Sequence, residues 1–140
     1  MARVVSVTDV GSEDDGFVPL YNRSIDDFEI KPVRGIPQAV NAQEDTTYTL
    51  VASDVGKIVT LDNAAAVTVT LPADADADFE VGVYVDMIQL GAGQVTVEAG
   101  AGATLRLSAL TADARAQYSR FTVQKIAADT WILWGDLAAS

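Results

Sequence analysis

Apolar and polar residues alternate with a period of two along most of residues 46–137. In VTVTLP, the side chains of Val67, Val69 and Leu71 point to one side, and the two threonines between them point to the other. QVTVEA and TLRLS repeat this pattern after glycine-rich turns. Short alternating segments separated by turns are typical of strands in sandwiches and small barrels. The sequence therefore predicts an all-β fold, a β-sandwich or small jelly-roll-like barrel of about seven or eight antiparallel strands.

The individual elements follow from the same pattern. A single helical turn is predicted around Ser53 or Asp54, ending at Gly56, and another over residues 111–117. The glycine-rich GAG and GAGA stretches predict turns between hairpin arms, and AADT predicts a hairpin turn before the last strand. Two near-repeats, GAGQVTVEAG and GAGATLRLSA, are too few and too different to predict a solenoid. Strands are expected over residues 57–61, 67–71, 81–90, 94–99, 104–108, 120–126 and 130–137.

The first 45 residues have a different character. Pro19, Pro32 and Pro37 interrupt every longer element, and the apolar pieces between them are short. A segment of this size without disulfides or a bound metal is marginal as an independent domain. We therefore predict an extended N-terminal arm over residues 1–45, which gains order on a neighbour, and a β-sandwich domain over residues 46–140.

The chain contains neither histidine nor cysteine, which excludes Ser-His-Asp and Cys-His catalysis and disulfides. Carboxylate neighbours such as Asp14/Asp15 and Asp26/Asp27 lie in the predicted arm, where they cannot hold the fixed separation that glycosidases need. We expect no enzymatic activity, no catalytic residue and no cofactor. The formal net charge of −11 argues against nucleic-acid binding. No apolar run is long enough for a membrane span, and no secretory signal is expected.

The acidic stretch PADADADFE has carboxylates at alternate positions, as a calcium loop does. Counting from Asp74, the sixth position is Phe79 and the twelfth is Val85, where an EF-hand needs glycine and glutamate. We therefore assign no metal site and predict an acidic surface loop. Pro72 would end the preceding strand, and Phe79 would anchor the loop on the core.

Two other stretches have possible binding functions. The glycine-rich GAGQVTVEAGAGA precedes strand patterns, whereas phosphate-binding loops precede a helix, so we expect turns. Trp131 and Trp134 could suggest saccharide stacking together with other aromatic residues. In a strand, however, these two point to opposite faces, so we expect one in the core and the other at a rim or subunit interface.

Three longer stretches resemble a small β-domain of tailed-bacteriophage structural proteins. They are YTLVASDVGKIVTLDNAAAVTVTLPA, VGVYVDMIQLGAGQVTVEAGAGATLR and YSRFTVQKIAADTWILWGDL, and the resemblance covers residues 46–137. The resemblance implies a virion part such as a tail or fibre component, a head fibre or a capsid decoration protein. It implies assembly, often as a homotrimer, and carries no catalytic residues.

An arm followed by one compact acidic domain favours a capsid decoration or cementing protein on the outer capsid surface, assembled in the host cytoplasm. Its expected partners are the major capsid protein and further copies of itself. The alternative is a tail or fibre component that adsorbs to host-surface saccharides. For contact with other subunits or with the capsid we predict aromatic and large aliphatic residues, namely Phe17, Leu20, Tyr21, Phe28, Ile30, Tyr84 and Trp134.

Overall fold

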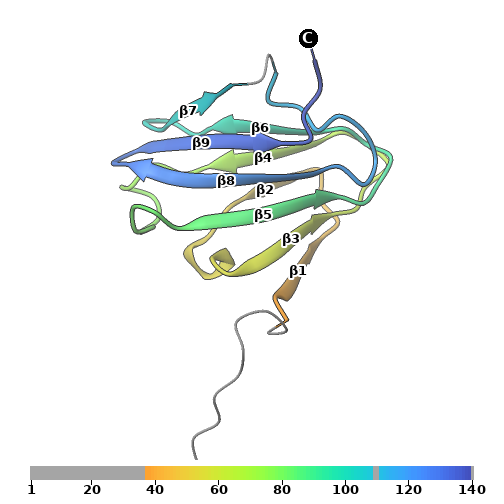
Figure 1. Ribbon diagram of the computed structural model, residues 1–140. Coiled ribbons are helices and arrows are strands. Elements are labelled where there is room, and N and C mark those ends of the chain that lie inside the picture. Colours follow the sequence, from red (N-terminus) through yellow and green to blue (C-terminus); the bar gives the residue numbers. More distant parts are fainter. Residues whose placement is uncertain (1–36, 109–110, 140) are drawn as a thin grey trace, which may run out of the picture. The chain divides into compact units, whose positions relative to one another are not determined.

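The computed structural model describes residues 37–108 and 111–139. The chain divides into two units, Met1–Pro37 and Gln38–Ser140, and the description below concerns the second. Its secondary structure is almost wholly strand (Figure 1), so the all-β class is confirmed. The elements are β1 (Ala39–Gln43), β2 (Thr47–Thr49), the 3-10 turn η1 (Ala52–Asp54), β3 (Lys57–Leu61), β4 (Val67–Leu71), β5 (Tyr84–Gln89), β6 (Val95–Ala99), β7 (Thr104–Leu107), β8 (Arg120–Ala127) and β9 (Thr130–Gly135).

The strands form two sheets that share one hydrophobic core. The larger sheet has the order β1-β3-β5-β8-β9-β7, and the smaller one has the order β2-β4-β6. Inward side chains of both sheets belong to a single buried cluster, which includes Val69 and Val97 from the small sheet and Met87, Phe121 and Trp131 from the large one. The alternation read from the sequence is therefore the alternation between core and surface.

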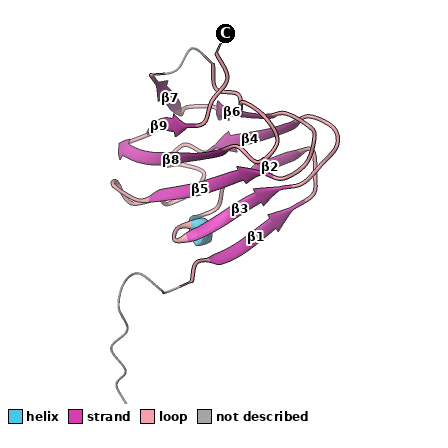
Figure 2. Ribbon diagram, turned by 45° about the vertical axis from the view of Figure 1, so that its right-hand side comes forward, coloured by secondary structure: helices cyan, strands magenta, loops and turns pink. Residues whose placement is uncertain are grey.

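The first six strands wind back and forth between the two sheets (Figures 1 and 2). The strands β1, β3 and β5 pair in parallel in the large sheet, and β2, β4 and β6 pair in parallel in the small one. Five of the seven ladders are parallel, so the predicted antiparallel pairing is wrong for most of the fold. Three turns of a two-sheet coil are present where we had expected no solenoid. The physical reason is that alternation reports burial and not strand direction.

The GAG stretch is a corner of this coil and not a hairpin turn. A Cβ atom on Gly91 or Gly93 would overlap the backbone of Asn63 or Ala65 in the preceding corner. The amide of Gly93 donates to the carbonyl of Asn63 at 2.8 Å, and the side chain of Asn63 donates to the carbonyl of Glu44 at 2.6 Å. The corners therefore stack closely, and glycine is required because two backbones meet there.

The coil is closed at one end by the last part of the chain. The strands β8 and β9 form the predicted antiparallel hairpin and lie between β5 and β7 in the large sheet. Residues 112–114 lie along β6, where the amide of Val97 donates to Ala112 and that of Ala114 donates to Val95. Residues 111–117 contain no helix, so that prediction is wrong. Their backbone groups bond to β6 and to the C-terminal residues instead of to each other.

The opposite end of the coil begins within the range that we predicted as the arm. Strand β1 ends two residues before the predicted boundary and pairs along its whole length with β3. The predicted turn before β3 is present as η1, and Gly56 ends it with a φ of +82°. Figure 2 shows this turn beside β3.

Candidate functional site

The outward side of the large sheet presents several large apolar side chains among polar and charged ones. Strand register places Val40, Ile58, Asp86, Thr122 and Trp134 in one row across β1, β3, β5, β8 and β9. The neighbouring rows add more apolar side chains on β5 and β9. We call this surface the apolar face and define it by Val40, Ile58, Tyr84, Ile88, Ile132 and Trp134.

The outward side of the small sheet is polar. Register places Thr47, Thr68 and Thr96 in one row and Thr49, Thr70 and Glu98 in the next. Each of these side chains alternates with the core residues of its strand. We call these six residues the threonine face.

A charged group at the centre of the apolar face is neutralised within the chain. Asp86 accepts a hydrogen bond from the hydroxyl of Thr122 at 2.6 Å and another from the guanidinium of Arg120 at 2.8 Å. Burial raises the pKa of Asp86, but these hydrogen bonds outweigh it, so the net pKa lies below its usual range. The carboxylate is therefore ionised at neutral pH and paired on the face itself.

The structure brings two of the predicted contact residues to this one face. Tyr84 is 51% exposed and Trp134 is 42% exposed. Trp131 is fully buried, and its indole N–H donates to the carbonyl of Pro72 at 3.0 Å. The expectation that one tryptophan lies in the core is confirmed, and the place of Trp134 at a rim or subunit interface stays a prediction. The predicted contacts in the arm lie outside the described residues; they are Phe17, Leu20, Tyr21, Phe28 and Ile30.

The acidic stretch after β4 is held by a buried lysine. The side chain of Lys125 is 1% exposed, and its ammonium pairs with the carboxylate of Asp74 and donates to the carbonyl of Phe79 at 2.9 Å. Phe79 packs edge-on against Trp131 with ring centroids 5.0 Å apart, so its predicted anchoring role is confirmed. The hydrogen bond from Lys125 holds the pKa of Asp74 below its usual range. Asp74, the first of the alternating aspartates, is thus paired with the ammonium of Lys125.

Metal-ligating side chains do not gather in groups of three or more within residues 37–108 and 111–139. In that same part of the chain, no helix has the length and apolar character that a membrane span requires.

A buried carboxylate ties together the first turn of the coil. Asp54 is fully buried and accepts hydrogen bonds from the hydroxyl of Tyr48 and the amide of Asn41, each at 2.7 Å, and from the backbone of Val51 at 3.0 Å. Burial, together with the neighbouring carboxylate of Asp54, raises the pKa of Tyr48 to about 12. These contacts join β1, β2 and η1 into one hydrogen-bonded network, which gives it a structural role.

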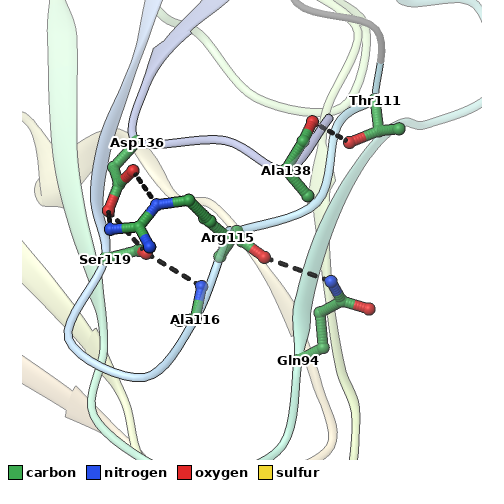
Figure 3. A network of polar contacts seen from close by, with 8 residues as sticks. Gln94, Thr111, Arg115, Ala116, Ser119, Asp136 and Ala138 are labelled. Atoms are coloured by element: carbon green, nitrogen blue, oxygen red, sulfur yellow. Dashed lines mark hydrogen bonds and ion pairs between the residues drawn. The ribbon is translucent and has the colours of Figure 1, made fainter. Parts of the chain in front are cut away.

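A second polar network fixes the C-terminal residues (Figure 3). Arg115 makes a bidentate pair with Asp136 at 2.6 and 2.8 Å, and the hydroxyl of Ser119 donates to the same carboxylate at 2.8 Å. These contacts hold the pKa of Asp136 below its usual range. Nearby, Thr111 donates to the carbonyl of Ala138 at 2.8 Å. The network joins the strand-connecting loop to the chain end and presents no unpaired catalytic group.

Sequence reasoning missed most of the apolar face because it needs the register of strands that are distant in the chain. Lys125, in contrast, had a sequence signal. Phe121, Val123 and Lys125 are at alternate positions of one strand, so their side chains point to the same, inner side. A lysine in that position is a buried cation that needs a partner.

In comparisons with known proteins, no family model, no curated protein and no solved structure matches the chain.

Proposed function

We propose that this protein is a structural component of a tailed-phage virion, which decorates and cements the outer surface of the capsid. The observation that carries the proposal is the contrast between the two outward faces. One face of the same domain is threonine-rich, whereas the other presents Tyr84 and Trp134 among isoleucines. Exposed apolar patches of this kind are typical of interaction surfaces.

The resemblance of residues 46–137 to phage structural domains supports the same role and implies a homotrimer. In this proposal the domain is a two-sheet sandwich, the part of the predicted arm that precedes β1 contacts the major capsid protein, and the acidic surface keeps the free chain soluble and away from packaged DNA. Added contacts between capsid subunits would resist rupture of a DNA-filled shell.

The test adds the purified full-length chain to capsid shells that lack it and measures the temperature at which the shells rupture. The proposal expects saturable binding and a higher rupture temperature. Binding without any change in the rupture temperature would reject the cementing role.

The alternative proposal is a tail or fibre component that adsorbs to host-surface saccharides. It is supported by the two exposed aromatic rings on one face, because such rings stack on sugars. Binding to host cells or glycans, with none to shells, would favour it over the decoration role.

A further inference from the structure

The apolar face has a residue order that is complementary to itself. Its central row reads Val40, Ile58, Asp86, Thr122 and Trp134 across the sheet. The polar pair occupies the middle, and apolar side chains occupy both ends. The midpoint of the six-stranded sheet lies between β5 and β8, so Asp86 and Thr122 flank it and Ile58 and Trp134 lie one strand further out.

We infer that a second copy of this chain covers the apolar face through a two-fold, face-to-face contact. This inference rests on the proposed assembly role and names the partner for that surface. A two-fold axis parallel to the strands, between β5 and β8, would place β3 of one copy over β9 of the other. Ile58 would then face Trp134 of the second copy, and Asp86 would face Thr122. Every contact would occur twice, as in isologous dimers.

The neighbouring rows fit the same operation. Ile88 would face Arg120, whose aliphatic stem can cover it, and Tyr84 would face Gln124. Stacked sheets pack about 10 Å apart with their strands within about 30° of each other, so contacts near the axis keep this register.

The charge on the apolar face allows a second copy to approach there. The whole chain carries a formal net charge of −11, so most of its surfaces repel another copy. On the apolar face the carboxylate of Asp86 is paired with Arg120, and Arg106 lies beside Ile132. Two copies that meet there bring no unbalanced carboxylates together.

The resemblance implies a trimer, whereas this face favours a pair. A three-fold arrangement brings two different surfaces together at each contact. In the central row, the pairs Ile58 with Trp134 and Asp86 with Thr122 instead match one surface to itself.

The first experiment measures self-association of the full-length chain by sedimentation equilibrium. The substitution Trp134→Glu places a charge on the apolar face, and Thr70→Glu places the same charge on the threonine face as a matched control. We expect the wild-type chain and the control to form pairs. Trp134→Glu should raise the dissociation constant by at least about 30-fold, because it replaces a large aromatic contact with a charge. Circular dichroism checks that both variants are folded.

A second measurement does not depend on that variant. Because the natural chain has no cysteine, a copy with Ile58→Cys can be mixed with a copy with Trp134→Cys and treated with a short bis-maleimide. We expect efficient linkage between these copies and little between Thr49→Cys and Thr70→Cys, which lie on the threonine face.

A wild-type chain that stays single at every soluble concentration would overturn the inference. So would a trimer, equal effects of the two glutamate substitutions, or equal linkage on both faces. If the chain stays monomeric but still raises the rupture temperature of shells, the two-fold pair is rejected and the cementing function is not. If the chain forms pairs but leaves the rupture temperature unchanged, the cementing function is rejected and the pair is not.

Discussion

The two outward faces of this domain differ although both are built from alternating strands with β-branched residues. On the small sheet, every outward position of the paired rows is threonine or glutamate. On the large sheet, isoleucine, valine, tyrosine and tryptophan occupy six of the outward positions, and polar side chains such as Asp86, Arg120 and Gln124 lie between them. A sheet needs only one apolar face to bury a core. The second apolar face of the large sheet therefore requires an explanation beyond folding, and contact with another chain provides one.

The largest expected effect on the free energy of unfolding comes from comparing a tryptophan on the inner side of the large sheet with one on its outer side. Trp131→Ala should lower the free energy of unfolding by about 3–5 kcal/mol, because it empties a fully buried site. Trp134→Ala should cost less than about 1 kcal/mol in the dilute single chain. Urea unfolding measures both. Similar costs would show that Trp134 is part of the core and would remove it from the apolar face.

The next effect concerns the buried lysine that holds the acidic loop. Lys125→Ala should cost about 2–3 kcal/mol, since it removes a buried stem and leaves the carbonyl of Phe79 without a donor. Lys125→Met keeps the stem and should cost less. Urea unfolding compares the two variants. A Lys125→Met chain that is as stable as the wild type would show that the stem of Lys125 contributes packing and that its ammonium adds nothing to stability.

A titration tests the hydrogen-bond network of the first coil turn. The pKa of Tyr48 is raised to about 12 from 10.0, so its contribution to stability is complete below pH 10 and is lost as pH rises towards 12. Ultraviolet absorbance of tyrosinate should show a late transition that Tyr48→Phe removes. If the substitution leaves the titration curve unchanged above pH 11, Tyr48 is not bonded to Asp54 as described.

A smaller effect tests the charge at the centre of the apolar face. Asp86→Asn should cost about 1 kcal/mol at neutral pH, because it weakens the bonds from Thr122 and Arg120. The pKa of Asp86 is lowered in the folded state, so its contribution is present above the unfolded pKa of about 3.9 and is lost as pH falls through the folded pKa. Urea unfolding of both chains should therefore show a difference at pH 7 that shrinks in acid. A constant difference would contradict the ion pair.

The smallest effect on stability should come from the threonine face. The double substitution Thr68→Val and Thr70→Val should change the free energy of unfolding by less than about 0.5 kcal/mol, because both side chains point outward from strands that valine favours. Sedimentation should then show new association through the small sheet. A large loss of stability would mean that these hydroxyls make contacts that the fold depends on.

The fold was predictable in its local parts. The residues of β3 and β4 match the predicted segments, and so does the hairpin of β8 and β9, because alternation and turn residues act within a few positions. Strands β1 and β2 were not predicted. Both segments are short, and their apolar and polar residues do not alternate clearly. They are strands because they pair with β3 and β4.

The candidate site was predictable only in part. Trp134 was expected as a contact because it points to the opposite face from Trp131, and Tyr84 was expected as another aromatic residue of the strands. Both residues lie on one face, and Ile58 and Val40 lie in the same row as Trp134. This arrangement depends on ladders between strands that are far apart in the chain. No local pattern reports which strand lies beside which.

By itself, the sequence determined which side chains of each strand share a face, where the chain turns, and that histidine and thiol chemistry are absent. Those properties depend on residue type and on near neighbours. Only the tertiary structure decided that the glycine corners stack, that most ladders are parallel and that Lys125 neutralises Asp74. It also decided that one sheet keeps a second apolar face. These outcomes come from contacts between residues distant in the chain, where packing and hydrogen bonding select one pairing among many with the same alternation.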